Sequence, residues 1–274
     1  RINKPYGDTV ILVKQAGNAA TGGRDEYGVI YLRVMQDNAE LAVTSNNSST
    51  YKITTPQIDG SYNFTVSLKS EGSVWTWGSN SYGKLGNGDM ALLDQMLPVQ
   101  VALGEQEAKI VCMSCREEQL ESEYTAAGNG TLTCALCGQS FSRSDAEVSA
   151  YLYNIVTVAA GKDFAVAVDK DGGVWTWGQN SMGQLGTGYT SSQGQVSPVR
   201  VKAGAARDED KVTVNGVDYL SNIVYVAAGD DFVVAVTRQG YVYAWGANGS
   251  GQLGISSTRE SNLPVRVLAG STAT

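Results

Sequence analysis

Apolar and polar residues alternate in short runs along most of the chain, which is the pattern of strands with one buried face. The clearest example is FAVAV, residues 164–168, followed by VWTW, residues 174–177. Between them stands DKDGG, residues 169–173, whose glycines suit a tight turn. We therefore expect an antiparallel hairpin from Phe164 to Trp177.

The same order of elements occurs three times, at residues 57–101, 155–201 and 223–267. Each copy continues from the hairpin into a Gly-Lys-Leu-Gly or Gly-Gln-Leu-Gly turn and closes with a Pro-Val-x-Val strand. A repeated unit of about 45 residues with four short strands is typical of a propeller blade. We therefore expect an all-β fold with three β-propeller blades within residues 56–274.

The copies resemble repeats of the regulator of chromosome condensation family, in which Ala-Gly precedes a D-G-x-V-x-x-W-G-x-N-x-x-G-Q-L-G pattern. In this chain the second copy reads AAGKDFAVAVDKDGGVWTWGQNSMGQLG, residues 159–186, and all five tryptophans lie within the three copies. The resemblance implies a ring of about seven blades, within the range known for propellers.

The chain departs from the family pattern at one position. Phe64, Phe164 and Phe232 stand where the family usually has a histidine, and the chain contains no histidine. We expect all three phenylalanines to be buried at equivalent places in their blades.

Two insertions separate the copies, residues 104–150 and residues 203–222. Each falls after a Pro-Val-x-Val strand and before the next copy, so the two leave from equivalent loops and should emerge on the same face of the ring. Residues 1–55 do not fit the repeat. Runs such as TVILV and VIYLRV predict strands there, in an N-terminal β segment whose type of module the pattern does not define.

All four cysteines lie in the first insertion as two CxxC pairs, Cys112 with Cys115 and Cys134 with Cys137. Eighteen residues separate the pairs, which is the spacing of a zinc ribbon. Four thiolates leave no open position on a tetrahedral zinc, so the predicted zinc is structural. Two disulfides are the alternative, and they would suit a secreted protein.

The net charge of −7 and the pI near 4.7 argue against nucleic acid as a partner, because phosphates would be repelled. Eight acidic and three basic residues place −5 of this charge in residues 104–150. No apolar stretch is long enough to cross a bilayer as a helix. We expect no nucleic-acid partner and no transmembrane segment in this stretch.

The composition favours binding over catalysis. The absence of histidine excludes Ser-His-Asp and Cys-His systems and the HExxH metal site. GSNSYGK, residues 78–84, imitates a phosphate-binding loop, but Leu85 follows where Ser or Thr should hold magnesium. The leading hypothesis is therefore a non-catalytic binding or scaffolding module for a protein or glycan.

Two other functions stay open. The resemblance allows a guanine-nucleotide exchange factor for a small GTPase, and paired carboxylates would suit a carbohydrate-active enzyme. The resemblance to bacterial surface proteins with repeats such as YLSNIVYVAAG, residues 219–229, implies a secreted or cell-surface location, with the cytoplasm as the alternative. Since three blades cannot close a ring, we expect a longer polypeptide, or further copies of the chain, to complete it.

Overall fold

The computed structural model describes residues 9–15, 26–32, 41–44, 50–89, 91–112, 114–115, 118–126 and 130–269. Its centre is three four-stranded antiparallel sheets, in each of which strands that follow one another in sequence are paired. The first blade contains β5 (Gln57–Gly60), β6 (Phe64–Leu68), β7 (Val74–Gly78) and β8 (Gln95–Gln100). The predicted all-β, blade-based fold is confirmed.

The other two blades repeat this arrangement. The second contains β15 (Ile155–Ala160), β16 (Phe164–Asp169), β17 (Val174–Asn180) and β18 (Ser191–Arg200). The third contains β21 (Ile223–Ala228), β22 (Phe232–Thr237), β23 (Val242–Gly246) and β24 (Ser261–Arg266). The register is the same in all three, because the phenylalanine that opens the second strand pairs with the glycine that follows the last tryptophan of the third.

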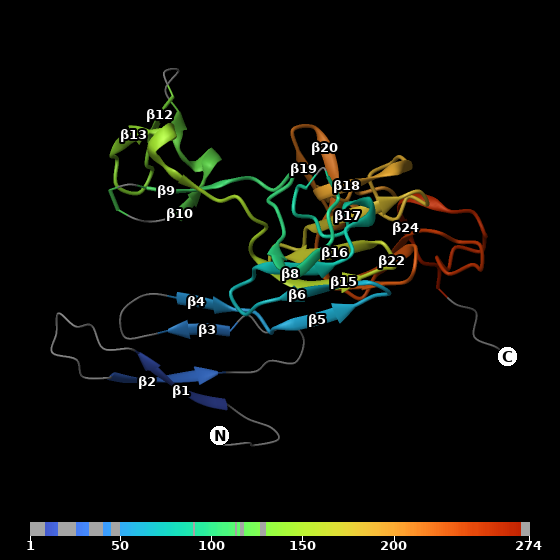
Figure 1. Ribbon diagram of the computed structural model, residues 1–274, viewed down its shortest axis with the longest axis horizontal. Helices are drawn as coiled ribbons and strands as arrows, with labels where there is room; N and C mark the ends of the chain where they lie inside the picture. The colour runs from blue at the N-terminus through green and yellow to red at the C-terminus, as the bar shows by residue number, and fades with distance from the viewer. Residues whose placement is uncertain are drawn as a thin grey trace.

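Blade 2 lies between the other two, with β15 against β5 and β6 on one side and against β21 on the other (Figure 1). Every residue of β16 is therefore buried. In β6 and β22 burial alternates instead, as expected for strands with one covered face. We call the face of a blade that points to the preceding blade its leading face, and the opposite one its trailing face.

Two apolar clusters fill the junctions between the blades. Phe64, Val66 and Leu68 on the trailing face of blade 1 pack with Ala165 and Ala167 of blade 2. Phe164, Val166 and Val168 on the trailing face of blade 2 pack in the same way with Val233 and Ala235 of blade 3. Large side chains on one blade thus fit against small ones on the next.

The expectation for the three phenylalanines is right for two of them. Phe64 and Phe164 are buried, with 3% and 0% of their surface exposed. Phe232 is only partly buried, because it lies on the trailing face of blade 3, which no described residue covers with a further blade. Its position in the repeat is as expected, and its burial depends on a neighbouring blade.

Short elements make up the first insertion. It contains β9 (Lys109–Val111), β10 (Glu118–Leu120), β11 (Thr125–Ala126), β12 (Thr131–Thr133), β13 (Ser140–Ser142) and β14 (Glu147–Val148). Strand β9 lies between β10 and β14 in one small sheet, and β12 lies between β11 and β13 in the other. The second insertion is a hairpin of β19 (Lys211–Val214) and β20 (Val217–Leu220).

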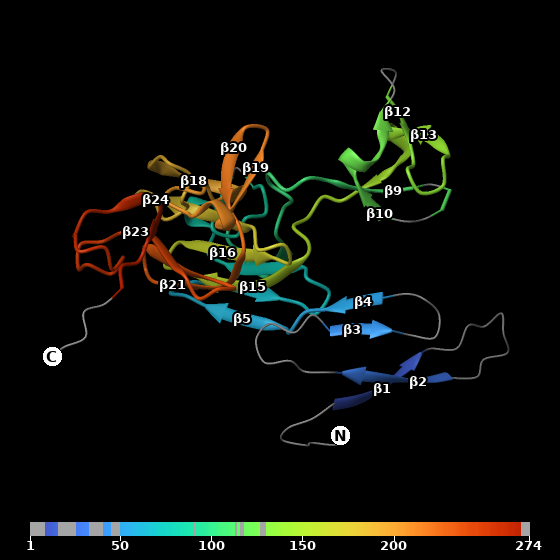
Figure 2. The same cartoon turned by 180° about the vertical axis from the view of Figure 1, so that it is seen from behind.

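The N-terminal region contains two further antiparallel hairpins. One pairs β1 (Thr9–Gln15) with β2 (Glu26–Leu32), and the other pairs β3 (Leu41–Thr44) with β4 (Thr50–Ile53). Viewed from behind, both lie in the lower part of the picture, and β4 leads into β5 beside the β6–β7 turn, where the Thr54 backbone N–H donates to the Ser70 carbonyl at 2.7 Å (Figure 2). The runs TVILV and VIYLRV, which predicted strands, overlap β1 and β2.

One pair of glycines separates the effect of a close blade contact from that of backbone strain. Gly172 and Gly240 lie in equivalent hairpin turns of blades 2 and 3, with φ of +83° and +84°, so alanine is strained at both. A Cβ at Gly172 would lie 2.7 Å from the backbone nitrogen of Asn222, whereas nothing lies within 4 Å at Gly240. We expect Gly172→Ala to lower the free energy of unfolding by about 1–3 kcal/mol more than Gly240→Ala does.

Urea unfolding followed by tryptophan emission would measure this difference. Equal losses for the two variants would show that blades 2 and 3 do not approach each other as closely as described.

Candidate metal centre and interaction face

The first insertion brings its four cysteines together. Cys112 follows β9 and Cys134 follows β12, and each is joined by a short turn to the second cysteine of its pair. The Sγ atoms of Cys112 and Cys137 are 3.6 Å apart, those of Cys115 and Cys134 are 3.8 Å apart, and all four lie within 4.8 Å of one another. These contacts cross between the two CxxC pairs, so the pairs face a common centre.

The sulfur spacing fits a metal and does not fit disulfides. A tetrahedron with metal–sulfur bonds of about 2.3 Å has edges of about 3.8 Å, close to the observed contacts. A disulfide requires about 2.05 Å. The cluster can therefore hold one metal ion through four thiolates, which would fill a tetrahedral shell.

The surroundings of Cys112 and Cys134 suit thiolate ligands. Hydrogen bonds to Cys112, above all the one from the backbone N–H of Cys115, lower its pKa from 9.0 to about 6. The Cys134 thiol donates to Gln119 Oε1 at 3.2 Å, and Gln119 is itself buried. A metal-bound thiolate cannot donate, but rotation of the Gln119 amide would offer its NH₂ group to the sulfur instead. Gln119 is thus suited to position Cys134, and no motif in the sequence indicated it.

The insertion has only a small core besides the cysteines. Ile110, Tyr124 and Leu132 are buried there, and Phe141 packs edge-on against Tyr124 with ring centroids 5.7 Å apart. The Tyr124 hydroxyl donates to the Ile110 carbonyl at 2.9 Å, and burial raises the pKa of Tyr124 to about 12. So few apolar side chains cannot hold a subdomain of this size by themselves, which is the usual reason for a structural metal.

Hydrogen bonds fix the base of the insertion to the blades. The amide group of Gln106 donates to the carbonyl of Tyr153 and accepts from its backbone N–H, at 3.1 and 3.0 Å, which ties the two ends of the insertion together. Glu105 donates its backbone N–H to the Pro198 carbonyl and accepts from the Arg200 backbone, at 3.0 and 2.9 Å. The insertion that follows blade 1 is thus attached to the outer strand of blade 2.

The second insertion is attached in an equivalent way to the next blade. The backbone N–H of Ala205 donates to the Pro264 carbonyl of blade 3 at 2.8 Å, as Glu105 does to Pro198. The buried carboxylate of Asp210 accepts from the Tyr243 hydroxyl at 2.8 Å and from the Asn222 amide at 2.9 Å. Both oxygens of this carboxylate are occupied, so its role is to anchor the hairpin.

Both insertions lie on the same side of the blades (Figure 1). In an antiparallel sheet the linkers between blades leave from the ends of the strands that also carry the β6–β7, β16–β17 and β22–β23 turns. The two insertions and these turns together form one surface, which we call the insertion face.

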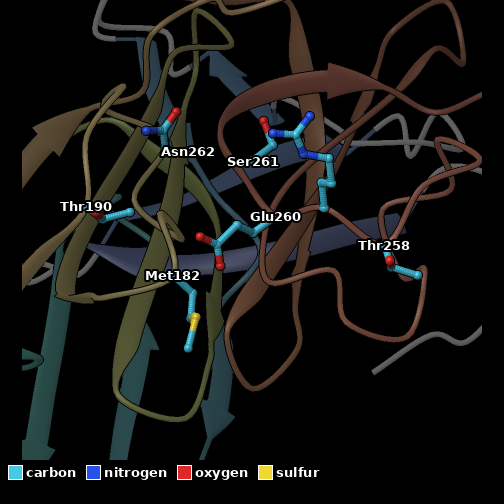
Figure 3. A pocket seen from close by; sticks show the side chains of 7 residues that line it. Met182, Thr190, Thr258, Glu260, Ser261 and Asn262 are labelled. Atoms are coloured by element: carbon cyan, nitrogen blue, oxygen red, sulfur yellow. The ribbon is translucent and has the colours of Figure 1, made fainter.

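A groove of about 520 Å³ lies among the β17–β18 and β23–β24 loops, at the opposite ends of the strands (Figure 3). Its lining comes from blades 2 and 3: Met182, Thr190, Thr258, Arg259, Glu260, Ser261 and Asn262. This lining has one carboxylate and no nucleophile paired with a base, so it does not form a catalytic set. The sequence did not indicate this groove, because its residues are far apart in the chain.

Among the described residues, no helix is long and apolar enough to cross a membrane.

Fold and site together define a β-propeller built from sequence repeats and carrying a cysteine-rich insertion. Two descriptions of the regulator of chromosome condensation (RCC1) repeat match the chain, one at residues 71–115, 171–236 and 239–273 and the other at 57–84, 155–184 and 223–252. These matches cover more than half of its length, so the chain belongs to the RCC1 repeat family.

Its relatives include the human E3 ubiquitin-protein ligase HERC2, 28% identical over 74% of this chain and 4% of the ligase. The ultraviolet-B receptor UVR8 of Arabidopsis thaliana is 27% identical over 93% of this chain and 54% of the receptor. The chain therefore spans a small part of the first and about half of the second.

Among solved structures, yeast RCC1 (Prp20) bound to Kap60 is 20% identical, with a TM-score of 0.38, over 80% of this chain and 50% of that chain. Prp20p of Saccharomyces cerevisiae, whose structure was described with its binding properties to Gsp1p and histones, is 16% identical, with a TM-score of 0.37. That match covers 89% of this chain and 61% of Prp20p.

Proposed function

We propose that the chain is a non-catalytic binding module in which the blades are a rigid scaffold and the insertion face recognises another protein. One observation carries the proposal: two unrelated insertions leave from equivalent linkers, and each is fixed to the next blade through the same proline carbonyl position, Pro198 or Pro264. A scaffold that places variable segments side by side is a common way to build a recognition surface.

The metal site supports this interpretation. We propose that zinc binds to Cys112, Cys115, Cys134 and Cys137, because four thiolates in a tetrahedral arrangement are its preferred structural ligands. The ion would keep the first insertion folded, so that the insertion meets its partner in one conformation. Such preorganisation reduces the entropy lost on binding.

A protein partner is favoured by what the solved relatives bind. Yeast RCC1 was crystallised with Kap60, and Prp20p was studied for binding to Gsp1p and histones. By analogy we assign this chain a protein partner. A glycan partner is the alternative, and a secreted or cell-surface location is proposed from the sequence alone.

Selection from a random-peptide display library would test the role of the insertion face. We expect peptides selected on the whole chain to lose binding when residues 107–149 are replaced by a short Gly-Ser linker. The matched variant replaces the β19–β20 hairpin at residues 211–220 by a two-residue turn. Peptides that keep their affinity for both variants would contradict the proposal, and a glycan array read in parallel would reveal the other class of ligand.

The family membership itself supports one alternative, nucleotide exchange on a small GTPase. We expect the chain to leave the rate of fluorescent-nucleotide release from a panel of small GTPases unchanged. Acceleration of release by any member of the panel would favour the alternative. Hydrolysis of a glycan library would favour a carbohydrate-active enzyme instead.

A further inference from the structure

A buried lysine stands where the other two copies of the repeat have glutamine. Lys84 occupies the position of Gln184 and Gln252 in the Gly-x-Leu-Gly turn, and none of its surface is exposed. At this place Gln184 donates to Asp231 of the next blade at 3.2 Å, so a neutral amide is sufficient to join two blades. Burying a charged ammonium group costs more than burying an amide. The lysine therefore needs a reason other than the contact between blades.

Two side chains converge on the Lys84 amine. Its Nζ lies 2.6 Å from Oδ1 of Asn63 in its own blade and 2.6 Å from Oδ1 of Asp163 in blade 2. Asn63 and Asp163 have equivalent positions, each directly before the phenylalanine that opens the second strand of its blade. An amine, a carboxamide and a carboxylate from three segments far apart in the sequence thus meet at one nitrogen.

The surroundings hold the amine away from water. Nζ lies 5.6 Å from the centroid of the Phe64 ring, which is itself buried. The Lys84 carbonyl accepts from the indole Nε1 of Trp177 at 3.0 Å, so the backbone of the lysine is fixed as well. The Asp163 side chain is 16% exposed, and of the three groups only the carboxamide belongs to an exposed residue. The reactive nitrogen is therefore held in a site from which water is largely excluded.

We propose that Lys84 and Asn63 form an amide bond between their side chains, with Asp163 as the catalytic acid and base. The Lys84 nitrogen attacks Cγ of Asn63, and the new C–N bond replaces the bond from Cγ to Nδ2. The amine must be neutral to attack, and the Asp163 carboxylate at 2.6 Å is placed to take its proton.

The reaction balances without an oxidant, a cofactor or a second substrate. The leaving nitrogen takes up one further proton of the attacking amine through the same carboxyl group and departs as ammonia. The carboxyl group releases to the solvent the proton that it took first. The products are one side-chain amide and one ammonia, so the chain becomes lighter by the mass of ammonia.

The distances bring the reacting atoms close together. A C=O bond is about 1.23 Å long, so the Asn63 Cγ lies within about 3.8 Å of the Lys84 nitrogen. Reacting atoms that are ready for attack are about 3–3.5 Å apart, so a small rotation of the Asn63 side chain is sufficient. An ion pair alone would need only Asp163, whereas here a carboxamide carbon is also within reach of the amine.

The junction between blades 2 and 3 contains no amine at the same place. Gln184 Nε2 contacts Asp231 Oδ1 at 3.2 Å and Gln179 Oε1 at 3.3 Å, and an amide nitrogen is not a nucleophile of this kind. Of the two described junctions, we therefore expect a cross-link only at the first. It would connect two loops of blade 1 and stabilise that blade as a disulfide does, by restricting the unfolded chain.

Mass spectrometry on the whole chain tests the proposal. We expect an intact mass lower than that calculated from the sequence by one ammonia. Trypsin does not cleave after a modified lysine, so residues 53–69 should be found joined to residues 70–109. A wild-type chain of full mass, cleaved after Lys84, would show an ion pair only and would overturn the proposal. Loss of one water, with Lys84 joined to Asp163, would overturn it as well.

Three variants separate the roles of the groups. Asn63→Ala removes the carbon that is attacked, so this variant should have its full calculated mass. Asp163→Asn keeps the shape of the side chain without the acid and base, and should slow bond formation at least about 100-fold. Asp231→Asn, at the equivalent place in the next junction, is the matched control and should keep the cross-link. Tryptophan emission during urea unfolding shows whether each variant is folded. Bond formation at an unchanged rate in a folded Asp163→Asn variant would contradict the role of the carboxylate.

Discussion

Removal of the zinc that we propose for the four cysteines should unfold the first insertion and leave the three blades folded. In the part of the insertion that the structure describes, the buried core besides the cysteines is Ile110, Tyr124 and Leu132, whereas the blades contain two large apolar clusters of their own. Without the ion, the four sulfur atoms take up protons and no longer connect the two small sheets. Binding energy of a structural zinc, of the order of 10 kcal/mol, is then lost from the folding of the insertion.

The positions of the tryptophans make this prediction easy to measure. All five lie in the blades and none in residues 104–150, so tryptophan emission reports the blades alone. On chelation under reducing conditions we expect unchanged emission together with fast amide exchange at Ile110 and Leu132. Replacement of all four cysteines by serine should have the same effect. A shift of tryptophan emission on chelation would show that the insertion and the blades unfold together.

Phe164→Ala should strongly destabilise the blades. Its ring is fully buried between blades 2 and 3, so its removal would leave a cavity in the core between them. Loss of a buried phenylalanine ring costs about 3–5 kcal/mol of the free energy of unfolding. Urea unfolding at a low protein concentration would measure it.

Phe232→Ala is the matched control, because Phe232 has the same place in blade 3 but is only partly buried. We expect this variant to lose less than half as much stability as Phe164→Ala. A loss below about 1 kcal/mol for Phe164→Ala would contradict the described packing of the two blades.

The repeat pattern was sufficient to predict the blades, because each blade depends on local contacts between neighbouring strands. The alternation in FAVAV and the DKDGG turn place β16 and β17 without any information from elsewhere in the chain. Burial could not be predicted in the same way. Phe164 and Phe232 have the same place in similar local sequences, DFAVAV and DFVVAV, and their exposure differs because, among the described residues, only Phe164 has a blade on its trailing side.

The same distinction holds for the candidate site, where some contacts follow from a sequence pattern and others depend on how the strands pack. The CxxC spacing was enough to predict that Cys112, Cys115, Cys134 and Cys137 lie together, because two CxxC pairs at this separation can meet around one tetrahedral metal. Gln119 beside Cys134 follows from no such rule, since its contact with the thiol depends on how β10 packs. The groove between blades 2 and 3 likewise joins loops that the sequence keeps apart.

X-ray absorption at the zinc edge, combined with metal analysis of the purified protein, tests the proposed zinc centre of the insertion most directly. We predict one zinc per chain, bound by four sulfur atoms at about 2.3 Å. A chain that contains no zinc and whose cysteines are joined as disulfides, with sulfur atoms about 2.05 Å apart, would contradict it.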